Sequence, residues 1–389
     1  MKGHIVKRGE DTWSLVFDLG RGEDGKRKQK WVTVRGTKRE AEKELARLLH
    51  EAHTGTFVEP SRMTLAEYLE YWLENYAQTK VSPKTFESYA EFIRLYIIPK
   101  LGQHKLAKLQ VAHIQSYYTQ MLTSGRLKRA GGLSAQSVLH QHRILRQALQ
   151  QAVKWQFLGR NPADAVVAPR PDHREMRALT DRETAQLLKA AEGTRLYMPI
   201  LLAITTGLRR GELLGLRWAD MDLSTGVLSV RQSLGRTRSG MAFKPPKTAK
   251  SRRTVTLPAF VIEALERHRA VQNEERRLLG GAYQDQDLVA AEPDGQPRSP
   301  GALSRAFSKL IIAKRLPQVR FHDLRHSHAT QLLKQGVHPK IVSERLGHST
   351  IGLTLDTYSH VLPGMQEEAA KRVDTALRAA LEKEGTDQP

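Results

Sequence analysis

Histidine, arginine and tyrosine side chains with complementary chemistry lie close together in the last quarter of the 389-residue sequence. His322, Arg325 and His326 are three and four positions apart, so a helix that begins near His322 would present them on one face. A guanidinium offers a planar set of donors that fits a phosphate, and an imidazole can give or take a proton near neutral pH. His348 follows a second helical stretch, and Tyr358 comes next as a candidate nucleophile. The stretch therefore predicts a site that binds an oxyanion and acts on it.

A second arginine motif lies upstream, at the junction of two predicted helices. Thr206 and Gly207 end one helix, and Arg209 lies at the start of the next. The first turn of a helix favours anions, because its N–H groups are free and the helix dipole is positive there. Glu212 lies three residues on and can orient the guanidinium from the same face. Taken alone, this pattern fits a capped helix with surface arginines equally well.

In their order along the chain, these motifs resemble those of the tyrosine recombinases, the phage integrase family. The matching positions are Thr206-Gly207-x-Arg209-x-x-Glu212, Pro246-Lys247-Thr248 with Ser251 and Arg253, His322-x-x-Arg325-His326, Leu346-Gly347-His348, and Tyr358. Each motif alone is unspecific, but all of them in this order are very specific. Nearly the whole chain is similar to the three-domain integrases of the phage lambda and conjugative-transposon type.

The resemblance implies how a phosphate would be held. Arg209 and Arg325 would clamp the scissile phosphate of DNA, and His348 would be a second phosphate contact. Glu212 would support Arg209, and His326 would have a minor structural role. Two guanidiniums near one phosphorus would also neutralise the charge of the pentavalent phosphorane.

The resemblance also implies which residues would make and break bonds. Tyr358 would attack phosphorus and form a 3′-phosphotyrosyl link, with His322 as general acid/base and Lys247 protonating the leaving 5′-oxygen. Tyrosine has an ordinary pKa of about 10, so attack at neutral pH needs a base or nearby positive charge. The phosphotyrosyl ester conserves bond energy, and the sequence has neither a carboxylate cluster for two metals nor a GK[ST] loop for ATP. We therefore expect no cofactor and no metal.

The composition indicates a polyanionic partner. The chain carries 62 Lys and Arg against 41 Asp and Glu, a net charge of +21 with histidines neutral. This surplus exceeds what solubility needs, and it is most one-sided for its length in residues 61–170. No apolar run is long enough to cross a bilayer, so we expect DNA rather than a membrane as the partner. Cysteine is absent, which excludes disulfides and fits a cytoplasmic location.

Three predicted domains, mainly helical with small β-sheets (an α+β class), would position these residues. Residues 1–58 predict an arm-type DNA-binding domain, with a hairpin before residue 36 and a helix over 41–53 behind a capping box at Thr37 and Glu40. Residues 62–165 predict a helical core-binding domain. Its four helices are expected at Thr64–Tyr76, Pro83–Tyr96, Val111–Thr123 and Ser134–Trp155.

Residues 174–389 predict a mostly helical catalytic domain. A basic hairpin at Phe243–Ser251 would carry Lys247, between strands near Val227–Val230 and Arg253–Leu257. An amphipathic tail helix over 364–384 is expected to dock onto a neighbouring copy. Basic residues of the first two domains are candidates for contacts with DNA phosphates, namely Lys26, Lys28, Lys80, Lys84, Arg143 and Arg146.

The preferred interpretation is a site-specific recombinase that integrates, and also excises, a prophage or other mobile element. The resemblance implies double-stranded attachment sites, a homotetramer on paired sites, and an excisionase and a DNA-bending protein as accessory partners. A non-catalytic DNA-binding regulator is an alternative, although a pure binder does not need Tyr358 beside the clamp. A relaxing topoisomerase of type IB is another, although relaxation needs no second DNA-binding module.

Overall fold

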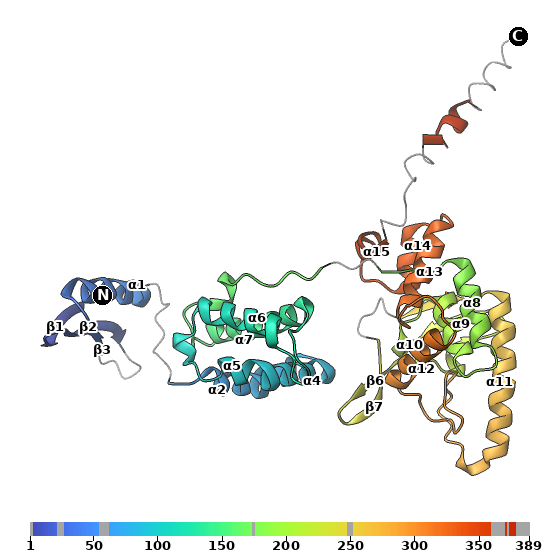
Figure 1. Cartoon of the computed structure of the whole chain (residues 1–389), viewed down its shortest axis with the longest axis horizontal. Coiled ribbons are helices and arrows are strands. Elements are labelled where there is room, and N and C mark those ends of the chain that lie inside the picture. The colour runs from blue at the N-terminus through green and yellow to red at the C-terminus, as the bar shows by residue number, and fades with distance from the viewer. Residues whose placement is uncertain are drawn as a thin grey trace, which may run out of the picture. The chain divides into compact units, whose positions relative to one another are not determined.

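The computed structural model describes residues 3–21, 27–53, 62–172, 176–246, 252–358, 370–371 and 373–378. The chain divides into two compact units, Met1–His173 and Arg174–Pro389, each with its own hydrophobic core or cores (Figure 1). In the part of the chain described, no helix combines the length and the apolar character needed to cross a membrane.

The first unit begins with a small sheet covered by one helix. Strands β1 (Gly3–Gly9), β2 (Thr12–Arg21) and β3 (Arg27–Arg35) pair antiparallel in chain order, and α1 (Lys38–His53) follows. Alternate residues of the sheet pack against the apolar side of α1, with Leu15, Phe17, Leu45 and Leu48 at the centre. The predicted capping box is present: the N–H of Thr37 donates to the Glu40 carboxylate at 2.8 Å.

Two features of this region differ from, or lie beyond, the sequence prediction. The predicted hairpin of β2 and β3 is present, but β1 was not predicted, because the run of apolar residues in it is too short to signal a strand. Lys26 lies outside the described residues, and the structure does not describe the side chain of Lys28.

The rest of the first unit is the predicted four-helix bundle. Between residues 62 and 172 the long helices cover 65–80 (α2 to α3), 83–101 (α4 to α5), α6 (Val111–Ser124) and α7 (Ala135–Lys154). Figure 1 shows α6 and α7 above α2, α4 and α5. Their buried sides share one core that includes Tyr68, Trp72, Ile93, Tyr118 and Leu145. The fold class is therefore confirmed here, helix by helix.

The first two helices are longer than predicted, because each contains a wider π-helical turn, Leu73–Ala77 in one and Ile93–Ile97 in the other. Pro99 has no N–H to donate to the preceding turn and would ordinarily end a helix. The π turn lies directly before Ile98 and Pro99, and the helix continues to Leu101. Local sequence rules therefore placed the end too early.

The second unit is mostly helical, with two small antiparallel sheets. Its helices are α8 (Asp181–Ala191), α9 (Tyr197–Thr206), α10 (Arg210–Leu214), α11 (Ala259–Leu279), α12 (Pro300–Ala313), α13 (Asp323–Lys334), α14 (Pro339–Leu346) and α15 (Ile351–Tyr358). Nearly every residue of α9 is buried, and α8, α10, α11 and α13 all contact it. A helix that is apolar on all sides must lie inside the core, and α9 does so.

The strands of this unit include the two that were predicted. β4 (Met221–Asp222), β5 (Val227–Val230) and β8 (Arg253–Thr256) form one sheet, which confirms both of them. A further hairpin, which was not predicted, pairs β6 (Ser233–Thr237) with β7 (Gly240–Lys244), and Gly240 with a φ of +118° lies at its turn. The basic hairpin predicted over Phe243–Ser251 begins at the end of β7, but its residues 247–251 lie outside the described residues.

Two other predicted features lie wholly or largely outside the described residues. Lys247 is one of them. Most of the tail helix expected over 364–384 is the other, although residues 370–371 and 373–378 are helical and exposed.

Candidate active site

Two helix C-termini provide the carbonyl groups that hold Arg325. Helix α9 ends at Gly207 and α14 at Gly347, each glycine with a φ of +66° in the left-handed region. Arg325 on α13 donates from Nη1 to the carbonyl of Gly207 and from Nη2 to that of Leu346, both at 2.6 Å. Its side chain is 3% exposed. Because carbonyls at a helix C-terminus carry partial negative charge, they stabilise a buried guanidinium.

Arg209 reaches the same place from α10. It occupies the N-cap position of that helix, and its Nη2 donates to the carbonyl of Gly347 at 3.1 Å. Arg325 binds the carbonyl of Leu346, the neighbouring residue. The two guanidiniums therefore converge on adjacent peptide groups, although Arg209 and Arg325 are 116 positions apart in the sequence.

A buried carboxylate joins Arg209 to a third guanidinium. Glu212 is 6% exposed and accepts from Arg209 Nη1 at 2.8 Å and from Arg253 Nη2 at 2.9 Å. Arg253 also donates from Nε to the carbonyl of Arg345 at 2.7 Å. Burial alone would raise the pKa of Glu212, but the hydrogen bond and charge of Arg253, with the contacts of Arg209, lower it below its ordinary value.

Tyr358 lies at the end of α15 and bonds to His326 of α13. His326 Nδ1 and Tyr358 Oη are 2.7 Å apart, and the phenol ring is 2% exposed. His322, at the N-terminus of α13, lies edge-on to His326 with the ring centroids 5.3 Å apart. Burial raises the pKa of Tyr358 to about 12, so the phenol keeps its proton at neutral pH.

His348 completes the set from the loop between α14 and α15. Its Nδ1 lies 2.8 Å from Thr354 Oγ1, and Thr354 is fully buried. Burial, with the charges of Arg325 and Arg209, lowers the pKa of His348 to about 4. Burial, with His322 beside it, lowers the pKa of His326 to about 4 as well. These imidazoles are therefore neutral at pH 7, and the positive charge of the site resides on guanidiniums.

Arg325 keeps its charge despite lying close to two other guanidiniums. Burial, with the charges of Arg209 and Arg253, lowers the pKa of Arg325 to about 9, which is still above neutral. Burial, with the charge of Arg325, lowers the pKa of His322. Three arginines thus face one carboxylate, Glu212. This excess of positive charge is complementary to a phosphodiester.

The structure brings together most of the predicted site residues. Arg209, Glu212, His322, Arg325, His326, His348 and Tyr358 form one connected cluster through the contacts above. Sequence reasoning gave no role to Arg253 or Thr354, both of which hold members of this cluster. Arg253 carried a signal, since it is the inward residue of a strand that follows a basic segment. Thr354 carried none.

His328 and Arg345 belong to the packing around the cluster. Arg345 Nε donates to His328 Nε2 at 3.2 Å, and burial, with the charge of Arg345, lowers the pKa of His328 to about 3. This histidine is 5% exposed and lies against Gly207.

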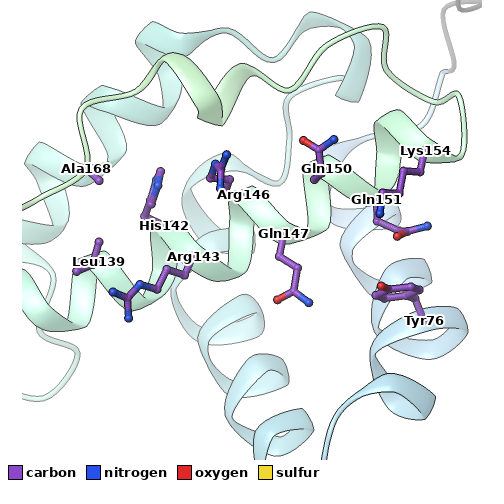
Figure 2. Close-up of a pocket in the computed structure, with 10 residues that line it drawn as sticks. All are labelled: Tyr76, Leu139, His142, Arg143, Arg146, Gln147, Gln150, Gln151, Lys154 and Ala168. Atoms are coloured by element: carbon purple, nitrogen blue, oxygen red, sulfur yellow. The ribbon is translucent and has the colours of Figure 1, made fainter. Parts of the chain in front are cut away.

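Two of the predicted DNA contacts line a pocket on the helical bundle. Figure 2 shows side chains of α7, among them Arg143, Arg146, Gln147 and Lys154, along a pocket of about 490 Å³. Arg146 Nε donates to Asp164 at 2.7 Å. The other two predicted contacts on the bundle, Lys80 and Lys84, are exposed, and Lys84 pairs with Glu87 at 3.4 Å.

Comparison with known proteins places this geometry in a family. Residues 177–365 match the phage integrase family, residues 64–122 its N-terminal SAM-like domain, and residues 4–52 an arm DNA-binding domain. The XerC-like tyrosine recombinase of Caldanaerobacter subterraneus subsp. tengcongensis is 30% identical, with 96% of this chain and 98% of that protein aligned. The chain belongs to the phage integrase family of tyrosine recombinases. It is an enzyme of site-specific recombination, a class that cuts and rejoins DNA strands.

Other relatives are integrases of mobile elements. The ICEBs1 integrase of Bacillus subtilis is 30% identical over 63% of this recombinase and 67% of its own length. The fold is similar to that of the Tn1549 transposon integrase in complex with transposon right end DNA, with a TM-score of 0.69 and 21% identity over 80% of this chain and all of that one. A lambda integrase tetramer bound to a Holliday junction has a TM-score of 0.57 and 20% identity, over 91% of this chain and 94% of that chain.

Replacing Gly207 with alanine tests the carbonyl that holds Arg325. A Cβ there would lie 2.7 Å from His328 Cδ2 and from Leu346 Cδ2, in a backbone conformation that L residues avoid. The left-handed backbone alone costs about 1–2 kcal/mol, and overpacking adds about 1–3 kcal/mol. Urea unfolding should show Gly207→Ala losing more stability than Gly193→Ala, whose φ is +70° with no atom within 4 Å. Equal losses would mean that the site relaxes around the methyl group.

Replacing Glu212 with glutamine tests the buried carboxylate. The variant loses the charge that two guanidiniums share, which should cost about 1–3 kcal/mol at pH 7. Because the pKa of Glu212 is lowered in the folded protein, its contribution is present above the ordinary carboxyl pKa and disappears as the pH falls through the folded value. Unfolding at pH 7 and at pH 4 should therefore show a smaller pH effect in Glu212→Gln than in the wild type. Glu263→Gln, at an exposed pair with Arg267, is the matched control and should change neither value.

Proposed function

We propose that this recombinase integrates a mobile element or prophage into DNA, and excises it, through a 3′-phosphotyrosyl intermediate. The convergence of Arg209 and Arg325 on adjacent carbonyls, beside the His326–Tyr358 pair, carries the proposal. Such a cluster holds two permanent positive charges next to a phenol, which is the arrangement that phosphoryl transfer to tyrosine needs.

Arg209 and Arg325 are proposed to bind the two non-bridging oxygens of the scissile phosphate. Their guanidiniums are held by backbone carbonyls and by Glu212, so little reorganisation is needed when the negative charge of the phosphorane develops. His348 is proposed as a further donor to the phosphate. Thr354 fixes the orientation of its ring by bonding Nδ1 and leaves Nε2 available to the phosphate.

Tyr358 is proposed as the nucleophile, and its place beside Arg325 in the same chain implies cleavage in cis. His322 is proposed as a general acid/base, because it lies at the N-terminus of α13 next to the clamp. Lys247 is proposed to protonate the leaving 5′-oxygen; the resemblance of the Pro246-Lys247-Thr248 motif supports this role.

A division of the chain into three domains would distribute the DNA contacts among them. We propose that residues 1–58 bind arm-type sites, residues 62–165 bind the core site and residues 174–389 cut it. The matches at 4–52, 64–122 and 177–365 support this division. Lys26 and Lys28 are proposed contacts in the first domain, and Lys80, Lys84, Arg143 and Arg146 in the second. On α7, glutamines lie among the basic residues, a combination that suits base edges as well as phosphates.

The assembly and the partners that we propose for this recombinase are based on its similarity to other integrases. The likeness to a lambda integrase tetramer on a Holliday junction supports a homotetramer on paired attachment sites, with the tail over 364–384 docking onto a neighbouring copy. An excisionase and a DNA-bending protein are proposed accessory partners. The reaction is proposed to take place in the bacterial cytoplasm.

A nicked suicide substrate tests the reaction. Attachment DNA from the region flanking the coding sequence should give a covalent protein–DNA adduct with the wild type and none with Tyr358→Phe, because the phenol oxygen is then missing. Arg325→Lys should lower the rate of adduct formation by about 10²–10³, since a lysine cannot reach both carbonyls and the phosphate. Tyr283→Phe lies outside the site and serves as the control. If Tyr358→Phe still forms the adduct, Tyr358 is not the nucleophile. If the protein relaxes supercoiled plasmid regardless of its sequence, a topoisomerase is favoured.

Arg143 tests the proposed DNA face of α7. Arg143→Ala should weaken binding to attachment DNA and lower the slope of log affinity against log salt by about 1, because one phosphate contact is lost. Arg267→Ala removes the same charge from an exposed position on α11 of the other unit and should leave the slope unchanged. Fluorescence anisotropy across a salt series provides the measurement. Equal slopes for both variants would exclude this face from the interface.

A further inference from the structure

Tyr358, the proposed nucleophile, and His326 are joined by a hydrogen bond. Oη of Tyr358 lies 2.7 Å from Nδ1 of His326, and the ring centroids are 5.7 Å apart. Among the described residues, the side chains of His326 and Tyr358 form no hydrogen bond other than this one. The two residues come from α15 and α13, so the contact is produced by packing and not by sequence proximity.

The surroundings of the pair decide where its proton lies. His322 faces His326 edge-on, Arg325 and Arg320 bring positive charge from α13 and its N-terminal side, and Asp323 brings one negative charge. Burial, with His322 next in importance, lowers the pKa of His326 to about 4, and burial raises that of Tyr358 to about 12. At neutral pH the imidazole therefore has one bare nitrogen, and the phenol still has its proton.

Hydrogen-bond satisfaction selects the tautomer. If the imidazole proton were on Nδ1, it would donate to Oη, and the phenolic proton would have no acceptor among the described residues. A buried donor without a partner costs about 1–3 kcal/mol. With the proton on Nε2 instead, the Tyr358 hydroxyl donates to the bare Nδ1, so the O–H of the 2% exposed phenol has an acceptor and the remaining N–H lies on the less buried imidazole. The geometry thus aims the phenolic O–H bond at a basic nitrogen.

We propose that His326 accepts the phenolic proton as Tyr358 attacks phosphorus, and returns that proton when the strand is rejoined. The inference rests on the proposed function of Tyr358 as nucleophile. The O–H bond of the phenol breaks and its proton moves to Nδ1, while the phenol oxygen forms a bond to phosphorus and the bond to the 5′-oxygen breaks. The leaving oxygen takes a proton from the acid on its own side. In rejoining, each of these transfers reverses.

Proton transfer must accompany bond formation, because the phenol holds its proton far more tightly than the imidazole would before DNA binds. As the oxygen–phosphorus bond forms, the phenol oxygen loses its basicity, and the negative phosphate near the arginines favours an imidazolium. His322, 5.3 Å away from His326 between ring centroids, remains available for the phosphate and leaving group. His326 is thereby a catalytic residue and not only a packing residue.

The test uses attachment DNA with a bridging 5′-phosphorothiolate at the scissile position. The thiolate leaves without a general acid, so the rate of adduct formation reports on the nucleophile and its base. His326→Asn keeps a hydrogen-bonding atom near the position of Nδ1 but cannot take a proton, and His326→Ala removes both functions. Both variants should lower the rate about 10²–10⁴-fold. His338→Asn, an exposed N-cap histidine of α14, is the matched control and should react as the wild type does.

The pH dependence separates a base from a positioning residue. The wild-type rate should be level between pH 6 and pH 8, because the imidazole of His326 is neutral and Arg325, whose pKa is about 9, is charged throughout this range. In the variants, attack depends on phenolate, whose fraction rises about tenfold per pH unit below the phenol pKa, so their rates should rise with pH. Recovery of the wild-type rate by His326→Asn, or parallel pH profiles for wild type and variants, would overturn the proposal.

Two further measurements distinguish a loss of catalysis from a loss of folding or of DNA binding. DNA affinity and unfolding temperature of each variant establish that the loss is not a failure to fold. If the wild type forms no adduct on this substrate, or Tyr358→Phe does form one, the proposed function itself fails. If the wild type reacts and both His326 variants match it, only the role of His326 fails.

Discussion

The structure of the site depends on keeping several guanidiniums together inside a protein. Arg209, Arg253 and Arg325 approach one another closely, and a single buried carboxylate, Glu212, neutralises only part of their charge. The remaining charge is offset by carbonyl groups at the C-termini of α9 and α14, where the helix dipole is negative. Both helices end in glycines with positive φ, which lets the chain turn while the last carbonyls point at the arginines.

This arrangement leaves a site that is incomplete in charge. The imidazoles of His326 and His348 are kept neutral by burial and by the nearby arginines, so they add hydrogen-bonding groups without adding further repulsion. Tyr358 keeps its proton for the same reason of burial. The excess of positive charge in the cluster is complementary to a phosphodiester.

The first unit presents basic side chains on a helical bundle that is separate from the second unit. Its bundle has a core of its own, and α7 presents arginines, glutamines and a lysine along one pocket. Arginines and lysines suit phosphates, and glutamines can distinguish base edges, so the composition of this surface is complementary to DNA. The separate cores allow the two units to be stable independently of each other.

The sequence alone determined the features that depend on near neighbours. The capping box at Thr37 and the helices of the bundle could be predicted from spacing, because helix rules act over three or four residues. The set of Arg209, His322, Arg325, His348 and Tyr358 was predicted from the order of motifs that resembles the tyrosine recombinases. The sequence did not predict β1, the π turns or the hairpin of β6 and β7, where pairing and packing override local preference. Only the tertiary structure decided that Arg253 shares Glu212 with Arg209, and that His326 rather than a more distant group bonds Tyr358. These contacts join residues 32 to 41 positions apart in the chain, and their geometry arises from how α13, α15 and β8 pack, which no local pattern encodes.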